Sequence, residues 1–295
     1  MTATRVARSA ASAGAGVVLR RLWRPLAQRA SNGARRAGID RLYVVVSLDC
    51  DTDEDAEVVR SVHDRLIASG ICPAYAVPGA QLERSPQVYA DIAASGAEML
   101  NHGWQQHCHL DVATRTYESS FFYDTLSWAE VERDVRRGHA THLAVLGHPP
   151  AGFRTPHFGT FQRRQQLDRL HRLLAALGYR YSTSSGPMVT MQRGPVFLGD
   201  AGVWELPVSG GTSAPHRPLD TWSFRFAPGR RGREQQYLDE VRALVALHVD
   251  RGLPGIVNLY GDPTQVDDWP EWFELMAELA PHAVTSYRDL LARVA

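Results

Sequence analysis

Two aspartates in the first quarter of this chain have the spacing of a chemically active pair. Asp49 and Asp51 stand two residues apart at the end of an apolar run, residues 42–48. At the end of a strand, one such carboxylate can bind a cation while the other accepts a proton from a water molecule. The acids that follow at 53–55 also suit the first turn of a helix, so the pair is equally well explained as part of a helix cap.

A second group of reactive side chains lies in the segment 101–109, directly after another apolar run. Three histidines and one cysteine occur within eight residues, namely His102, His107, Cys108 and His109. Neutral imidazoles combined with one carboxylate suit Zn²⁺ or a similar divalent transition metal and leave a position for water. Metal binding is favoured over the alternative, a polar loop without a ligand, because the upstream aspartates supply the carboxylate.

The third feature is an arginine at the end of a strand-like run, in the segment 152–159. If Arg154 points into the open end of a barrel that is rich in carboxylates, it can hold Asp49 through two hydrogen bonds and keep that carboxylate ionised. Backbone N–H groups of the turn that follows could stabilise an oxyanion. Without such partners, Arg154 would be an ordinary surface side chain beside a loop.

The elements that must position these residues alternate between strand-like and helical patterns from residue 42 onward. Short, β-branched apolar runs separated by amphipathic stretches are typical of repeated βα units and a mainly parallel sheet. Seven such runs with six helices between them favour a barrel over an open sheet. The expected strands are 42–48, 71–77, 97–100, 152–155, 179–183, 203–208 and 256–260, and the expected helices are 54–69, 85–95, 128–146, 162–177, 234–252 and 270–279.

The candidate residues follow the carboxyl ends of these predicted strands. Asp49 and Asp51 follow the first strand, the histidines follow the third, Arg154 ends the fourth and Asp262 follows the seventh. In βα barrels this rim carries the chemistry. We therefore expect four segments that are distant in the sequence to meet at one site.

In motif order as well as residue type, residues 40–293 resemble the polysaccharide deacetylase family, also called NodB-like or carbohydrate esterase family four. The segment 47–51 is similar to the Asp-x-Asp motif of that family, and His102 stands at the first histidine of its second motif. Arg154 and Pro156 match its Arg-x-Pro motif. The resemblance implies an α/β fold, a distorted (β/α) barrel with about seven parallel strands.

The resemblance also implies a role for each of these residues. Asp49 would be the catalytic base, and Arg154 would orient it. Asp51 and His102 would bind one divalent metal ion, most simply Zn²⁺. The acid that supports the arginine in the family is not evident, because residues 181–184 occupy its place without a carboxylate.

Two further departures from the family concern the metal site and the general acid. The family's second histidine falls at Gln106, so His107 is the expected third ligand after a one-residue insertion, with His109 or Cys108 as alternatives. Asp262 stands where the family has a general-acid histidine. Protonation of the leaving amine would then require a raised pKa at Asp262, or a water molecule.

The reaction implied by the resemblance is metal-assisted hydrolysis of an amide, which makes the chain an expected carbohydrate de-N-acetylase. Its expected substrate is an N-acetylated sugar or glycan precursor. The N–H of His157 would help to hold the oxyanion and Leu259 would enclose the acetyl methyl group. Pro156 and Phe158 complete the expected substrate contacts.

Two other functions are compatible with the same residues. The barrel could hydrolyse an amide that is not part of a sugar, as relatives of this fold do. Alternatively, the unusual histidine pattern could mark a degenerate barrel that binds a glycan without cutting it. Exposed aromatic side chains such as Trp104, Phe158 and Trp222 would then stack on sugar rings, although core packing is the simpler explanation for each.

Composition restricts the remaining classes of function. The formal net charge is zero and 44% of the residues are hydrophobic, so nucleic acid is not an expected partner. All 32 basic residues are arginine, which excludes a Schiff-base lysine and a phosphate loop that ends in lysine. Three cysteines in so long a chain argue against a disulfide framework and favour a reducing compartment, so we expect a cytoplasmic protein.

Residues 1–38 are expected to form a basic N-terminal arm ahead of the barrel at 39–295. The first 36 residues carry eight arginines and no acid, and their apolar stretch is too weak to span a bilayer. Arginines follow that stretch where a signal peptide would have its cleavage site. A loosely ordered arm is therefore favoured over a helix that rests on anionic lipid as a peripheral membrane contact.

Overall fold

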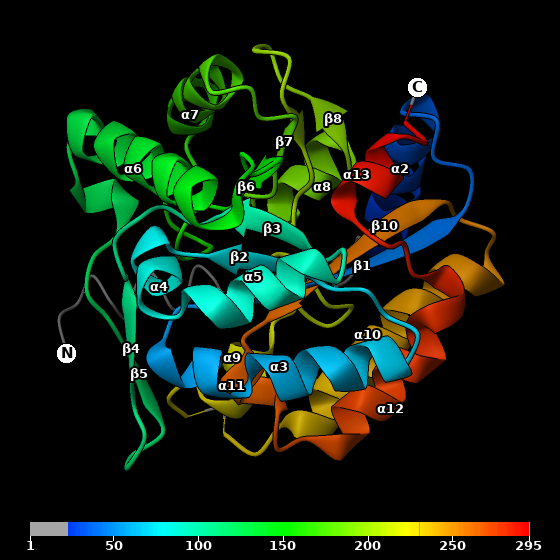
Figure 1. Cartoon of the computed structure of the whole chain (residues 1–295). Coiled ribbons are helices and arrows are strands. Elements are labelled where there is room, and N and C mark those ends of the chain that lie inside the picture. The colour runs from blue at the N-terminus through cyan, green and yellow to red at the C-terminus, as the bar shows by residue number, and fades with distance from the viewer. Residues whose placement is uncertain (1–22, 230, 295) are drawn as a thin grey trace, which may run out of the picture.

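The computed structural model describes residues 23–229 and 231–294 (Figure 1). Residues 1–22 of the expected arm lie outside this described part. In the rest of the arm the expected loose order is wrong, because residues 23–36 form helix α2 (Trp23–Arg36), which packs against the domain. The division of the chain at residue 38 stays a prediction. Among the described residues, no helix combines the length and the apolar character needed to cross a membrane.

Eight strands form one mainly parallel sheet. They are β1 (Leu42–Asp49), β2 (Ala74–Val77), β3 (Glu98–Asn101), β6 (Gly152–Phe153), β7 (Tyr181–Ser182), β8 (Phe197–Leu198), β9 (Trp204–Glu205) and β10 (Gly255–Gly261). Their order is β10-β1-β2-β3-β6-β7-β9-β8, and only β8 pairs antiparallel. The seven parallel strands coincide with the seven predicted apolar runs, so the predicted fold class is confirmed. The sequence prediction lacks β8 and a separate hairpin, β4 (Cys108–Asp111) with β5 (Thr116–Ser119).

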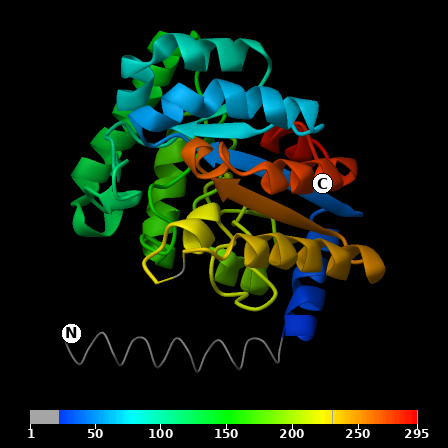
Figure 2. The same ribbon diagram turned by 90° about the horizontal axis from the view of Figure 1, so that it is seen from below.

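Helices cover the outside of this sheet. Figure 2 shows β1 and β10 running between α3 and α10. Six of the helices match the six predicted ones, whereas α2 and the shorter helices were not predicted. The helices besides α2 are α3 (Asp53–Ala68), α4 (Gly79–Arg84), α5 (Pro86–Ala94), α6 (Trp128–Leu146), α7 (Arg164–Ala176), α8 (Pro187–Arg193), α9 (Thr221–Arg225), α10 (Glu234–Asp250), α11 (Pro263–Val266), α12 (Pro270–Leu279) and α13 (Tyr287–Leu291).

The central pair of strands, β1 and β10, determines where the candidate residues lie. All eight residues of β1 are buried, as expected for a parallel strand covered on both faces. The register pairs Ser47 with Tyr260 and Leu48 with Gly261. Asp49 and Asp262 therefore leave the sheet at the same edge, although more than two hundred residues separate them.

On its other side β10 contacts an irregular segment, residues 208–220, in place of a further long strand. Ser209 N donates to the carbonyl oxygen of Asn258 at 3.0 Å, and Asp220 forms an isolated parallel bridge with Tyr260. The architecture is a distorted half-barrel, in which this segment and not a regular strand completes the wall beside β10.

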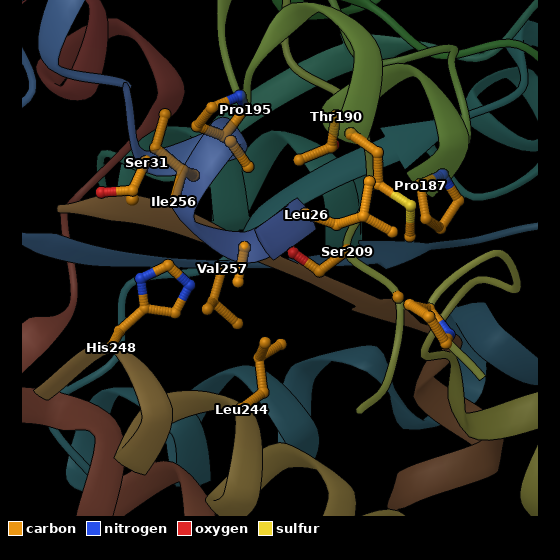
Figure 3. Close-up of a pocket in the computed structure, with 16 residues that line it drawn as sticks. Leu26, Ser31, Pro187, Thr190, Pro195, Ser209, Leu244, His248, Ile256 and Val257 are labelled. Atoms are coloured by element: carbon orange, nitrogen blue, oxygen red, sulfur yellow. The ribbon is translucent and has the colours of Figure 1, made fainter. Parts of the chain in front are cut away.

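Helix α2 packs against α8 and β10. The backbones approach closely, since a Cβ atom added to Gly33 would lie 2.8 Å from the Cα of Gly194. Beside this contact lies a small cavity of about 40 Å³ (Figure 3). Its lining is mainly apolar and includes Leu26, Leu244 and Val257.

Candidate active site

A larger cavity of about 350 Å³ opens at the carboxyl ends of the parallel strands. The four segments that were expected to meet all contribute to it, together with the β4-β5 hairpin and the start of α9. Ionisable side chains and aromatic rings make up most of the lining. They include Asp49, Asp51, His102, Tyr117, Phe122, His157, Phe158, Asp220, Trp222, Tyr260 and Asp262.

Two of these side chains, Asp51 and His102, form with the neighbouring His107 a group that could hold a metal ion. Asp51 follows β1, His102 follows β3, and His107 precedes β4. His107 Nε2 lies 2.9 Å from Asp51 Oδ2, and His102 Nε2 lies 3.4 Å from Asp51 Oδ1. Their candidate ligand atoms all lie within 4.8 Å of one another, and all three residues are buried.

The hydrogen bonds around this triad fit a bound divalent cation. His102 Nδ1 donates to the carbonyl oxygen of Arg154 at 2.8 Å, which leaves a lone pair on Nε2, directed toward Asp51. Within the described residues, Asp51 Oδ1 is buried without a hydrogen-bond partner. A buried carboxylate oxygen without a donor is costly, and a cation ligated by both groups would remove that cost. Asp51, His102 and His107 would hold the ion.

The electrostatics of the triad are those of an ionised carboxylate beside imidazoles. Burial alone would raise the pKa of Asp51, but His107 and His102 lower it well below its usual range. Burial likewise opposes protonation of His107, yet Asp51 raises the pKa of that imidazole. Burial lowers the pKa of His102 to about 3, so this ring is neutral and can donate a lone pair to a metal.

The structure selects one of the three residues considered as the last ligand. His107 points into the triad, whereas His109 is exposed on β4. Cys108 lines the cavity outside the triad, and burial raises the pKa of its thiol, which disfavours the thiolate that a metal requires. Gln106 turns away and accepts a hydrogen bond from Arg84 at 2.8 Å.

Asp49 lies beside the triad and is held by Arg154. Arg154 Nη1 donates to Asp49 Oδ1 at 2.5 Å, while Nη2 donates elsewhere, so the expected two-bond contact is a single hydrogen bond. Burial raises the pKa of Asp49 to about 6, and Arg154 opposes this rise. The Asp49 carboxylate is therefore ionised at neutral pH, and its pKa is close to that of an efficient general base. Its other oxygen, Oδ2, lies 3.9 Å from His102 Nε2.

Asp262 has the electrostatic surroundings of a protonated carboxylic acid. Burial raises its pKa well above the usual range, and the neighbouring carboxylates of Asp55, Asp51 and Asp49 raise it further. Gln265 Nε2 donates to Asp262 Oδ2. A raised pKa favours the protonated form of the carboxyl group, which can donate a proton.

Asp55 connects the loop of Asp51 to the loop of Asp262. Its Oδ2 accepts from the backbone N–H groups of Asp51 and Thr52, at 3.1 and 3.0 Å, and its Oδ1 accepts from the N–H and hydroxyl of Thr264, at 3.0 and 2.7 Å. Thr52 and Asp55 also form the capping box of α3. The helix-cap explanation therefore belongs to these two residues and leaves Asp49 and Asp51 for the cavity.

Asp220 lines the cavity but was not among the residues singled out from the sequence. It caps α9 by accepting from Ser223 N at 2.7 Å, and burial raises its pKa to about 6. A cap pattern of Asp and Ser three residues apart is visible in the sequence, but nothing in that pattern reveals the cavity beside it.

The predicted substrate contacts divide into two groups. His157 and Phe158 line the cavity, whereas Pro156 and Leu259 are buried outside its lining. Leu259 is only 1% exposed and belongs to the apolar core. The neighbouring residue Tyr260 faces the cavity instead, because alternate residues of a strand point to opposite sides.

Of the aromatic side chains considered for sugar stacking, two border the cavity. Trp222 is 39% exposed, and the Phe158 ring lies 4.6 Å from that of Tyr260. Trp104 lies outside the cavity lining, with the guanidinium of Arg137 over its ring at 3.0 Å.

The backbone of His157 has a left-handed conformation, with a φ of 58°, and its Nε2 donates to the carbonyl oxygen of His107 at 3.2 Å.

No protein-family model and no curated protein sequence matches the chain. Solved structures do match. A protein assigned as a polysaccharide deacetylase from Mycobacterium smegmatis has a TM-score of 0.64 at 20% identity, covering 87% of this chain and 91% of its own. Puue allantoinase has a TM-score of 0.62 at 11% identity, over 88% and 92% of the two chains. A CE4 family pseudoenzyme from Bacillus anthracis has a TM-score of 0.54 at 12% identity, over 85% and 66%.

The chain therefore has the NodB fold of the CE4 polysaccharide deacetylases, as its motifs implied. Identities of 20% or less show the fold alone. The same fold is shared by an allantoinase and by a pseudoenzyme. The reaction and substrate of this chain consequently have to be argued from its own residues.

Proposed function

We propose that this chain is a metal-dependent amidohydrolase that removes the acetyl group from an N-acetylated sugar or glycan precursor. The observation that carries the proposal is the juxtaposition of the Asp51, His102 and His107 triad with Asp49, which is held by Arg154. A metal-binding group and an oriented base at the floor of one cavity are the two requirements for activating a water molecule.

The chain's own residues support each proton transfer of the reaction. A divalent ion supplies polarisation of the amide carbonyl and a lower pKa for bound water. Asp49, with a pKa of about 6, is suited to accept the proton of the attacking water at neutral pH. The raised pKa of Asp262 favours its protonated form, which is suited to donate a proton to the leaving amine.

The cavity also supports a sugar as the substrate. Phe158, Tyr260 and Trp222 present rings to a space of about 350 Å³, within the range of small-molecule sites. Such rings stack on the apolar faces of sugars. Asp220 and Ser223 add polar groups at the same wall.

Acetate release from a panel of N-acetylated sugars, measured with Zn²⁺-loaded protein, tests the proposal. We expect turnover in the wild type and its loss in Asp49→Asn and His102→Ala. Bound metal, measured by elemental analysis, should fall in His102→Ala and persist in Asp49→Asn. His109→Ala is the matched control, because this exposed histidine lies outside the triad, and it should retain both metal and turnover. Wild-type rates in Asp49→Asn and His102→Ala together would reject the proposal.

The same experiment separates the two alternative functions. Hydrolysis of cyclic or linear amides without acetate release from any sugar would indicate a non-sugar amidohydrolase, a function compatible with the fold that this chain shares with an allantoinase. Sugar binding by the metal-loaded protein with no turnover would indicate a glycan-binding barrel. The carboxyl groups of Asp49 and Asp262 argue for turnover, because neither is needed for binding a metal or stacking a ring.

A further inference from the structure

The guanidinium of Arg154 is completely buried, so its donors need partners within the protein. Nη1 donates to Asp49, whereas Nη2 donates to Ser47 Oγ at 2.7 Å and to Tyr287 OH at 2.9 Å. Within the described part of the chain, Asp49 is the one carboxylate in ion-pair contact with this arginine. The other hydrogen bonds of the guanidinium go to neutral hydroxyl groups, and its Nε has no hydrogen-bond partner among the described residues.

Asn258 fixes the direction in which the Tyr287 hydroxyl donates its hydrogen bond. The side-chain NH2 of Asn258 donates to the carbonyl oxygens of Leu206 and Pro207, at 3.1 and 3.2 Å. Its carbonyl oxygen Oδ1 must therefore accept, and it does so from Tyr287 OH at 2.7 Å. Since the hydroxyl proton of Tyr287 is committed to Asn258, the Tyr287 oxygen is oriented to accept from Arg154.

Tyr287 itself is firmly placed. It is the first residue of α13, whose cap Ser286 accepts from Asp289 N at 3.0 Å. Its backbone N–H donates to Glu98 Oε2 at 2.8 Å, and its ring lies 5.1 Å from that of Tyr181. The side chain is fully buried. A hydroxyl so constrained can fix the position of the group that it contacts.

We propose that Tyr287 is a positioning residue that aims Arg154 at Asp49, so that the C-terminal helix sets the orientation of the base. The inference rests on the proposed function, in which Asp49 accepts a proton. A neutral hydroxyl supports the arginine without competing for its charge, which leaves the full ion pair to Asp49. It also supplies the support for Arg154 that residues 181–184, which contain no acid, do not offer.

Tyr287→Phe tests this role because it removes the hydroxyl and keeps the ring. We expect kcat to fall about tenfold to a hundredfold, with KM and metal content unchanged, because the base is misoriented and the ligands are intact. Tyr43→Phe is the matched control. Tyr43 is also a buried tyrosine, and its hydroxyl donates to Asp40 at 3.0 Å, away from the cavity. This variant should keep the wild-type kcat, and thermal unfolding of both variants reports any general loss of stability.

A double-mutant cycle distinguishes positioning through Arg154 from a separate effect. Added to Arg154→Lys, Tyr287→Phe should lower kcat little further, because the group through which it acts is already lost. A full second decrease, or an unchanged kcat in the single variant, would overturn the inference.

A crystal structure of Tyr287→Phe tests the same contact without turnover. Arg154 Nη1 should move away from Asp49 Oδ1, whereas Tyr43→Phe should keep the contact. An unmoved arginine would overturn the positioning role even if the wild type proved inactive on every acetylated sugar. Inactivity of the wild type would instead count against the proposed function, so the two failures are distinguishable.

Discussion

Two of the cavities formed by the described residues differ in size and in chemistry, although both border β10. The first residues of this strand, 255–257, line the cavity of about 40 Å³, whose wall is mainly apolar. Tyr260 lies near the end of the strand and Asp262 follows it, and both line the cavity of about 350 Å³. A parallel strand of this fold supplies packing at its start and reactive groups at its end, which is where side chains are least constrained by the core.

A perturbed pKa alone does not distinguish the two cavities. His248 borders the small one, and burial lowers its pKa as burial lowers that of His102. Its Nδ1 donates to the carbonyl oxygen of Leu253 at 2.9 Å, which is an ordinary structural contact. The larger cavity differs because several carboxylates and imidazoles influence one another there.

The largest effect is expected from removing the proposed acid of the larger cavity. Asp262→Asn keeps the shape of the side chain but cannot transfer a proton, so kcat should fall by about 10²- to 10⁴-fold. Bound metal should be unchanged, because Asp262 lies outside the triad. Steady-state acetate release checks the prediction, with the exposed Asp250→Asn as its control. A wild-type kcat in Asp262→Asn would assign the proton to water or to another residue.

A smaller effect, on stability, is expected from the buried acid at the wall of the same cavity. Burial raises the pKa of Asp220 from 3.8 to about 6, so the folded state holds this proton more tightly than the unfolded state. The associated stabilisation is present below pH 3.8 and is lost as the pH rises through about 6, a change of about 3 kcal/mol. Asp220→Asn should remove this part of the pH dependence.

Denaturant unfolding of the wild type and of Asp220→Asn at a series of pH values measures how much of the pH dependence of stability comes from Asp220. Other buried acids, including Asp55, also contribute to the wild-type profile, so the comparison must be made between variants. Asp239→Asn, on the exposed face of α10, should give a profile parallel to the wild type. If Asp220→Asn also runs parallel, the carboxyl group is not a source of pH-dependent stability.

The smallest effect is expected at the apolar cavity. Among the described residues, Ser31 Oγ is buried there without a hydrogen-bond partner. Ser31→Ala should therefore raise the free energy of unfolding by about 1 kcal/mol, since it removes an unsatisfied polar group. Activity should not change. A loss of stability on urea unfolding would indicate that the hydroxyl has a partner, such as a bound water molecule.

The sequence predicted the strands and the metal triad for identifiable reasons. Strands such as β1 are continuous apolar runs, and the bounds of α6 were predicted correctly from the helical pattern of residues 128–146. Asp51, His102 and His107 follow strand ends, and parallel strands bring such positions to one edge. These are local patterns combined with one rule of topology.

The supporting contacts could not be predicted in the same way. Tyr287 meets Ser47 across 240 residues, in a contact that depends on how α13 docks. Leu259 was predicted to contact the substrate but Tyr260 faces the cavity in its place, because the facing of a strand residue is set by register, which the sequence does not display. In the sequence Asp55 is an ordinary acid at the start of a helix. Its second set of partners comes from Thr264, which is distant in the sequence and therefore could not be predicted.

The contacts of Asp55 make position 262 open to redesign. Asp55 connects the loops of Asp51 and Asp262 through hydrogen bonds that do not involve the side chain at 262. An imidazole introduced there by Asp262→His would stand between the same two loops and would replace the proposed carboxylic acid by another proton donor. The side chain proposed to donate the proton can thus be changed by mutagenesis without changing the hydrogen bonds that hold the surrounding loops.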